Sequence, residues 1–254
     1  MPGGGSSRFL DGSAPRVFAH RGLALNAPEN TLPAFRHALL AGATHLETDV
    51  RASDDGVAVL SHDAEFAVPG ARIRVNRLTL AELHRINLGQ GQSFASLGEA
   101  LDAFPDARFN LDVKSEDAIE ATVAAVRAAN ATDRVLITSF SEARRARTVR
   151  SLPGVATSAS SALVGRAFLA AEFGFGGQVR RAVSGLSAIQ VPETVRSLRI
   201  LTPRFVRAMH TVGVEVHVWT VNDPAAMRRL LEAGVDGLIT DRCDLAVGVI
   251  AGRS

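Results

Sequence analysis

The chain has 254 residues, of which 46% are hydrophobic, and a formal net charge of +2, so it can bury a large core and carries no basic tract that would indicate a nucleic-acid partner. No stretch approaches the roughly 18 apolar residues of a membrane span, and residues 1–15 lack the apolar run of a signal peptide. One cysteine, Cys243, allows no internal disulfide. We therefore expect a cytoplasmic protein without stable membrane insertion, with a loose N-terminal tail over residues 1–15 and a single domain over residues 16–254.

Short β-branched runs alternate with amphipathic helical patterns from residue 16 onward. Helical patterns include residues 31–43, 117–130 and 223–234. About eight such β-α units in a chain of this length predict an α/β fold, the closed (β/α)₈ TIM barrel. The expected strands are residues 16–20, 45–50, 108–114, 134–140, 155–160, 188–192, 214–221 and 237–240.

The alternative fold is a doubly wound open sheet, which would normally carry a GxGxxG phosphate turn after its first strand. The turn at residues 20–30 has no such motif, which favours the barrel. Residues 57–105 exceed what one β-α unit needs, so we expect a short insertion after the second strand. Within it, the loop at 64–79 is expected to select the head group of the ligand.

Acidic residues gather on one face of two expected strands. Side chains alternate along a strand, so Glu47 and Asp49 share a face of the second strand, and Asp112 and Lys114 share a face of the third. The opposite faces are apolar. If those apolar faces meet the helices, the ionic faces look into the barrel, where unpaired charge is costly.

Crowded carboxylates need a cation. A divalent ion held by Glu47, Asp49 and Asp112 satisfies them, and ligands that are all oxygen favour Mg²⁺ or Ca²⁺. The alternative is an internal salt network in which arginines pair with Glu47 and Asp49. Lys114 is the only lysine in the chain, and its compact ammonium suits a point charge beside a metal and a phosphate.

Two of the seven histidines end expected strands or apolar runs. His20 closes the first strand, and His62 closes the apolar run that follows the second. Active sites of barrels assemble at strand ends. Two such histidines beside an acid cluster predict a catalytic acid and base that flank a metal.

Several motifs, taken in order and at their spacing, resemble the glycerophosphodiester phosphodiesterases. They are "HRG" at 20–22, "PENT" at 28–31, "LETDVRASDDGVAVLSHD" at 46–63, "VWTVND" at 218–223 and "GVDGLITDR" at 234–242. The resemblance implies that His20 and His62 are catalytic, and that Glu47, Asp49 and Asp112 bind the metal. The family usually has glutamate in an E-x-K motif where this chain has Asp112, which is one methylene shorter.

The same resemblance implies roles for residues around this centre. Arg21 and Lys114 are expected to bind the phosphate of the substrate, and Trp219 to line the pocket, although simple barrel packing would also explain a tryptophan there. Glu29 and Asn30, in "PENT", are expected to hold the histidine loop and the metal ligands in place.

The implied activity is metal-dependent hydrolysis of a small-molecule glycerophosphodiester to glycerol 3-phosphate and an alcohol, with the two histidines acting as acid and base. Two alternatives remain. One is a lysophospholipase D-like activity on acylated lipids, and the other is a non-catalytic barrel that binds glycerophosphate compounds. The head group, the choice of ion and the oligomeric state do not follow from the sequence.

Overall fold

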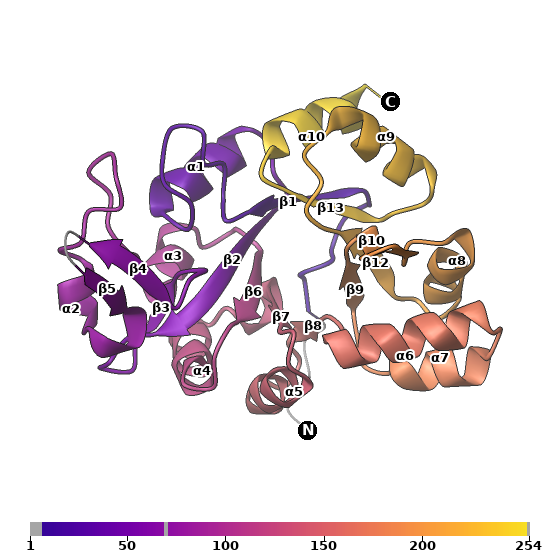
Figure 1. The fold of residues 1–254 in the computed structure, drawn as a ribbon, viewed down its shortest axis with the longest axis horizontal. Coiled ribbons are helices and arrows are strands. Elements are labelled where there is room, and N and C mark those ends of the chain that lie inside the picture. Colours follow the sequence, from indigo (N-terminus) through magenta and orange to yellow (C-terminus); the bar gives the residue numbers. More distant parts are fainter. Residues whose placement is uncertain (1–6, 69–70, 253–254) are drawn as a thin grey trace.

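The computed structural model describes residues 7–68 and 71–252. Eight parallel strands form a barrel with helices around its outside, in the order β8-β7-β6-β2-β1-β13-β12-β9 (Figure 1). A parallel bridge between Ser158 and Ala188 joins the two ends of this order. The predicted TIM barrel is therefore confirmed. Its strands are β1 (Arg16–His20), β2 (His45–Ala52), β6 (Phe109–Val113), β7 (Val135–Thr138), β8 (Ala156–Thr157), β9 (Ala188–Val191), β12 (Glu215–Val218) and β13 (Gly237–Thr240).

A helix follows each barrel strand, as the alternating pattern predicts. After β8 the chain forms two helices, α6 and α7, where the repeat needs only one. The helices around the barrel are α1 (Leu32–Leu40), α3 (Leu97–Ala103), α4 (Ala118–Ala128), α5 (Glu142–Ser151), α6 (Ser161–Glu172), α7 (Gly176–Ala182), α8 (Pro203–Thr211), α9 (Pro224–Glu232) and α10 (Cys243–Ala251), with a short 3₁₀ turn, η2 (Thr132–Arg134), before β7. None of the helices among the described residues has the length and apolar character needed to span a membrane.

The predicted insertion after the second strand is present. It begins with β3 (Ala58–Leu60), which pairs antiparallel with β2, and continues through the hairpin of β4 (Glu65–Val68) and β5 (Ala71–Arg74). The 3₁₀ turn η1 (Val75–Arg77) and the helix α2 (Leu80–Leu83) complete it. A second excursion, which the sequence reading did not predict, is the hairpin of β10 (Thr194–Val195) and β11 (Leu198–Arg199) after β9.

Local sequence explains where several helices begin. Thr79 and Ser96 each start a capping box, in which the hydroxyl accepts from the backbone N–H of the glutamate three residues on, and the carboxylate of that glutamate accepts from the backbone N–H of the cap residue. At α9 the Asp223 side chain accepts from the backbone N–H of Ala226 at 2.7 Å, and Pro224 occupies the first turn. These three caps fix where α2, α3 and α9 begin.

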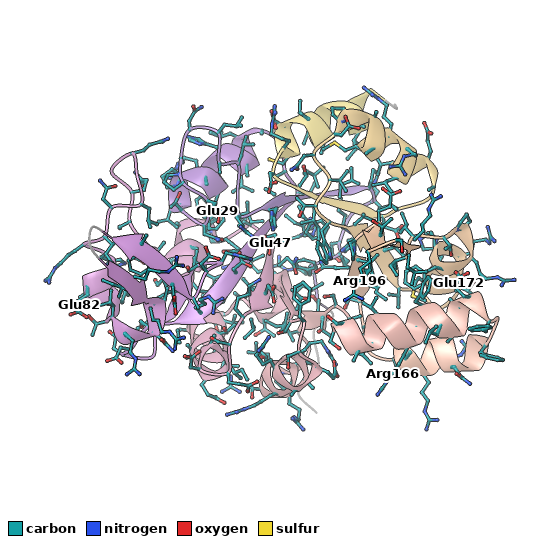
Figure 2. All side chains as sticks on the ribbon, in the orientation of Figure 1. Glu29, Glu47, Glu82, Arg166, Glu172 and Arg196 are labelled. Atoms are coloured by element: carbon teal, nitrogen blue, oxygen red, sulfur yellow. The ribbon has the colours of Figure 1, made fainter. Side chains whose placement is uncertain are left out.

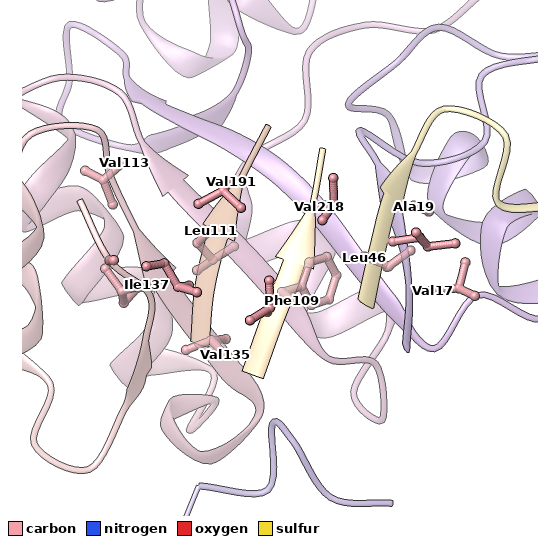
Figure 3. Close-up of a cluster of buried hydrophobic side chains, with 14 of the residues drawn as sticks. Val17, Ala19, Leu46, Phe109, Leu111, Val113, Val135, Ile137, Val191 and Val218 are labelled. Carbon is pink, nitrogen blue, oxygen red and sulfur yellow. The ribbon is translucent and has the colours of Figure 1, made fainter. Parts of the chain in front are cut away.

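The main core lies between the sheet and the helices. Leu46 and Val50 of β2, with Leu111 and Val113 of β6, are fully buried in it. Figure 3 shows Leu46, Leu111 and Val113 in this cluster. The apolar strand faces therefore meet the helices. The predicted orientation of the acidic faces, toward the inside of the barrel, follows from this packing.

A smaller cluster fills the barrel at the N-terminal ends of its strands. Phe9 is fully buried, its ring lies 4.7 Å from that of His45 and 6.2 Å from that of Phe18, and its carbonyl accepts from His45 Nε2 at 2.8 Å. Arg16 donates to carbonyls of the preceding segment and pairs with Glu215 at 2.7 Å. Burial of Phe9 holds residues 7–15 under the barrel, where the sequence predicts a loose tail; residues 1–6 lie outside the described residues, and the domain boundary at residue 16 stays a prediction.

Candidate active site

The carboxyl ends of the barrel strands enclose a cavity of about 660 Å³. In Figure 2, Glu47 lies near the middle of the barrel, and Glu29 lies between it and α1. Glu29 and Asn30 do not line the cavity but contact residues that do. The other eight predicted site residues all line it: His20, Arg21, Glu47, Asp49, His62, Asp112, Lys114 and Trp219.

The turn after β1 aims Arg21 into the cavity. Arg21 has φ of 58°, and its backbone N–H donates to the Glu47 carbonyl at 3.0 Å and to Glu47 Oε2 at 3.1 Å. Gly22 follows with φ of 86°, and a Cβ there would lie 2.7 Å from the α1 backbone, so only glycine fits. The guanidinium consequently lies between two acids, with Nε 3.0 Å from Asp49 Oδ2 and Nη1 3.0 Å from Glu29 Oε1.

Lys114 bridges two of the buried acids. Its Nζ lies 2.9 Å from Asp49 Oδ1 and 2.8 Å from Asp112 Oδ2. Asn30 Nδ2 donates to Asp49 Oδ2 at 3.3 Å. The alternative of an internal salt network thus describes Asp49, which contacts both Arg21 and Lys114. It does not describe Glu47, which pairs with no arginine side chain among the described residues.

The acids are not fully compensated by these cations. Burial and the neighbouring charge of Asp49 raise the pKa of Glu47 to about 8. Burial also raises the pKa of Asp112 above its usual value, despite Lys114. Burial opposes ionisation of Asp49 as well, but there Lys114 and then Arg21 outweigh it and lower the pKa. Arg21 and Lys114 therefore do not fully neutralise the buried acids, and a further cation would favour the ionised forms of Glu47 and Asp112.

A hard cation fits these donors chemically. Within the described residues, no three His, Cys, Asp or Glu side chains are already arranged around a common point that could hold a metal ion. The predicted ligands Glu47, Asp49 and Asp112 nevertheless offer only carboxylate oxygens, the donors that Mg²⁺ and Ca²⁺ take. Asp112 Oδ1 and Asn110 Oδ1 are buried without a hydrogen-bond partner and belong to residues that line the cavity.

Each predicted catalytic histidine has a carboxylate at Nδ1. His20 Nδ1 lies 2.6 Å from Asp241 Oδ1, and His62 Nδ1 lies 2.8 Å from Asp63 Oδ1. An ionised carboxylate can only accept, so each Nδ1 carries the proton and Nε2 is the nitrogen free to exchange protons. Burial lowers the pKa of His20, but the hydrogen bond to Asp241 and the charge of Glu47 outweigh it and raise the pKa.

The sequence reading did not identify these supporting groups. Asp63 and Asp241 stand in the motifs "SHD" and "ITDR", which supplied the only available signal. Arg51 was also missed; its guanidinium donates to the His62 carbonyl at 3.0 and 2.7 Å and holds the segment that follows β3. The contacts of Asp241 and Arg51 depend on packing between separate segments, whereas Asp63 directly follows His62 in the chain.

The far wall of the cavity is apolar. Trp219 and Phe140 meet edge to face, with ring centroids 5.8 Å apart, and Lys114 Nζ lies 5.8 Å from the centre of the Phe140 ring. The β10–β11 hairpin contributes Val195 and Leu198, which are 49% and 54% exposed. The sequence predicts that residues 64–79 select the head group, but none of those that the structure describes lines the cavity. We call the apolar lining formed by Phe140, Val164, Val195, Leu198, Ile200 and Trp219 the apolar wall.

Fold and site together define a class. A TIM barrel whose mouth combines two imidazoles, buried acids and two cations is equipped to neutralise an anionic ester and to move protons during its cleavage, which is the chemistry of a phosphoric diester hydrolase. The sequence profile of the glycerophosphoryl diester phosphodiesterase family matches residues 20–245. The chain belongs to this family, as the motifs predict, and it is an enzyme.

Individual relatives agree with this assignment. The probable glycerophosphodiester phosphodiesterase 2 of Mycobacterium tuberculosis is 40% identical over 96% of this chain and 97% of its own length. The crystal structure of a glycerophosphodiester phosphodiesterase from Agrobacterium tumefaciens matches with a TM-score of 0.75 at 25% identity, covering 93% of this chain and 99% of that one. A lysophospholipase D of Mus musculus is 32% identical over 42% of this chain and 37% of its own.

Proposed function

We propose that this enzyme hydrolyses glycerophosphodiesters to glycerol 3-phosphate and an alcohol with the help of a divalent cation. One observation carries the proposal: His20 and His62, three buried acids and two cationic side chains line a single cavity. The relative from M. tuberculosis, which the chain matches along nearly its whole length, bears the name of this activity.

The charged residues would bind the phosphate. Arg21 and Lys114 point their cations into the cavity and would stabilise negative charge on the phosphoryl oxygens. Glu47, Asp49 and Asp112 would hold the divalent ion, Mg²⁺ or Ca²⁺, which when bound supplies additional charge neutralisation as a Lewis acid.

The two histidines would divide the proton transfers. One Nε2 takes the proton from the attacking oxygen, and the other donates a proton to the departing alkoxide, each transfer being worth about 10²- to 10⁴-fold in rate. Glu29 would steady Arg21, and Asn30 would steady Asp49. Trp219 would form part of the surface that the alcohol portion of the substrate contacts.

The test follows release of glycerol 3-phosphate from glycerophosphocholine and glycerophosphoethanolamine. We expect chelation to abolish turnover, Mg²⁺ or Ca²⁺ to restore it, and His20→Ala and His62→Ala each to lose at least about 100-fold in kcat. His84→Ala is the matched control, because His84 pairs with Glu99 outside this cavity. Full activity in either of the first two variants would defeat the acid-base assignment. Tight calorimetric binding of glycerophosphocholine without product would favour the non-catalytic barrel instead.

The apolar wall favours a second candidate activity, the lysophospholipase D-like cleavage of acylated lipids. Its half-exposed Val195 and Leu198 offer an acyl chain a surface that a small polar head group does not need. The partial similarity to a mouse lysophospholipase D points the same way.

This second activity is tested by comparing lysophosphatidylcholine with glycerophosphocholine. Leu198→Asp should lower kcat/KM for the lysolipid and leave the small diester unaffected, whereas Leu40→Asp, at an 80% exposed position at the end of α1, should change neither. Equal losses on both substrates, or no turnover of the lysolipid, would exclude it. The cytoplasmic location and the domain boundary at residue 16 stay predictions.

A further inference from the structure

Two motifs of the chain, "VWTVND" and "GLITDR", enter the chemistry above only through Trp219 and through the contact of Asp241 with His20. The structure brings their polar residues, Asn222 and Asp241, to His20. We propose that Asn222 and Asp241 are positioning residues that fix the ring of His20 with Nε2 presented to the substrate. This inference rests on the catalytic role proposed for His20.

Strand register places the three residues together. β1 and β13 are parallel neighbours in which Ala19 pairs with Thr240, so His20, the last residue of β1, and Asp241, the first residue after β13, stand side by side at the mouth. Their side chains meet at 2.6 Å, between Nδ1 and Oδ1. Asn222 comes from the loop after β12, the strand on the other side of β13.

Asp241 needs a second anchor. Its side chain is 51% exposed, and an exposed carboxylate paired only with an imidazole would hold the ring weakly, because both groups could turn into solvent. Asn222 Nδ2 donates to the other carboxylate oxygen, Oδ2, at 2.7 Å. Asn222 Oδ1 in turn accepts from the Asp241 backbone N–H at 2.9 Å and from Thr240 Oγ1 at 3.0 Å. Both carboxylate oxygens are therefore occupied, one by each neighbour.

The consequence for His20 is a defined tautomer. Because the carboxylate only accepts, Nδ1 of His20 carries the proton and Nε2 keeps its lone pair, 3.9 Å from Glu47 Oε2 at the cavity. Without Asp241 the other tautomer becomes available and the ring can rotate about its side-chain bonds. Whether His20 accepts or donates the proton, Nε2 must face the substrate and Nδ1 must stay on Asp241, so the fraction of competent enzyme falls.

A double-mutant cycle separates this support from a general structural role. With glycerophosphocholine as substrate, Asp241→Ala should lower kcat about 10- to 100-fold with KM little changed, and Asn222→Ala should lower it less. Because Asn222 acts through Asp241, the double variant should be no slower than Asp241→Ala alone. If Asn222 merely stabilised its loop, the two losses would multiply, and that result would overturn the proposal.

The imidazole ¹⁵N chemical shifts of His20 give a readout that is independent of turnover. We expect Nδ1–H in the wild type and a mixed tautomer in Asp241→Ala. The matched control is Asp244→Ala, three residues further on, whose carboxylate pairs with Arg242 at 2.8 Å and should leave both the shifts and kcat unchanged. If Asp241→Ala fails to fold in a thermal melt, Asp241→Asn takes its place.

If the ¹⁵N shifts of His20 were the same in Asp241→Ala as in the wild type, the proposed positioning of His20 by Asp241 would be refuted. If the shifts did change in Asp241→Ala but His20→Ala were fully active, the catalytic role proposed for His20 would be refuted. The positioning of its ring by Asp241 would still stand. The two failures are therefore distinguishable.

Discussion

The buried position of Phe9 makes the segment before the barrel a measurable part of its stability. The Phe9 side chain is fully enclosed by a cluster that includes Phe18, Leu136 and Ile239. Phe9→Ala would remove the ring and leave a cavity between the strand ends. Fully buried phenylalanines cost about 3 to 5 kcal/mol when truncated to alanine.

This loss is large enough to measure in a chain of this size. A domain of about 250 residues loses roughly 2 to 4 °C in Tm per kcal/mol, so Phe9→Ala should lower Tm by about 6 to 20 °C. Urea denaturation, followed through the single tryptophan Trp219, gives the free energy of unfolding directly. The expected kcat of the folded fraction is unchanged, because Phe9 lies at the opposite end of the barrel from the active site.

Phe173→Ala is the matched control, since it makes the same chemical change at a side chain that is 70% exposed. We expect it to alter the free energy of unfolding by no more than about 0.5 kcal/mol. If Phe9→Ala lowered the free energy of unfolding as little as Phe173→Ala, the segment that contains Phe9 would not be packed against the barrel in solution, and the prediction would be refuted.

Three further predictions follow from buried groups. Burial lowers the pKa of His45 from 6.5 to about 3, so at pH 4 the unfolded chain binds a proton that the folded protein does not. About 3 kcal/mol of the stability present at pH 7 should therefore be lost at pH 4. In urea titrations at the two pH values, His45→Gln should remove this pH dependence, and an unaltered dependence would contradict the prediction. Lys114→Met leaves Asp49 and Asp112 without their shared cation and should lower the free energy of unfolding by about 3 to 5 kcal/mol, measured by denaturation with a chelator present. An unchanged denaturation midpoint would mean that the acids are neutralised in another way. Gly22→Ala places a Cβ at a residue with φ of 86°, 2.7 Å from the α1 backbone, so it should lower the free energy of unfolding by more than about 1 kcal/mol and reduce turnover. A normal thermal melt and a normal kcat would show that the turn tolerates a Cβ.

Local periodicity explains how much of the site the sequence could predict. Alternation along β2 and β6 places Glu47, Asp49, Asp112 and Lys114 on one face whatever the rest of the chain does, so their convergence needed only the barrel topology. The strand-end position of His20 and His62 is local information of the same kind.

The missed features depend on contacts between distant segments. Asp241 supports a residue 221 positions away, and nothing near "ITDR" reveals that partner. Phe9 stands in a Gly- and Ser-rich stretch that reads as a loop, and only the open end of the barrel makes it a core residue. The β10–β11 hairpin mixes apolar residues with arginines in "TVRSLR", so its contribution to a cavity wall has no periodic signature.

Neighbouring strands of the barrel are paired over unequal numbers of residues. β2 and β6 are aligned over five residue pairs, whereas β8 and β9 meet through the single bridge of Ser158 and Ala188. Backbone amides at that joint should exchange with solvent sooner than those of the acidic strands, because fewer hydrogen bonds must break to open it. Ala159 and Pro192, just beyond the joint, line the cavity on its apolar side. The joint between β8 and β9 is therefore the place where the barrel should open most readily, while the longer pairing of β2 with β6 keeps the strands that carry the acids together.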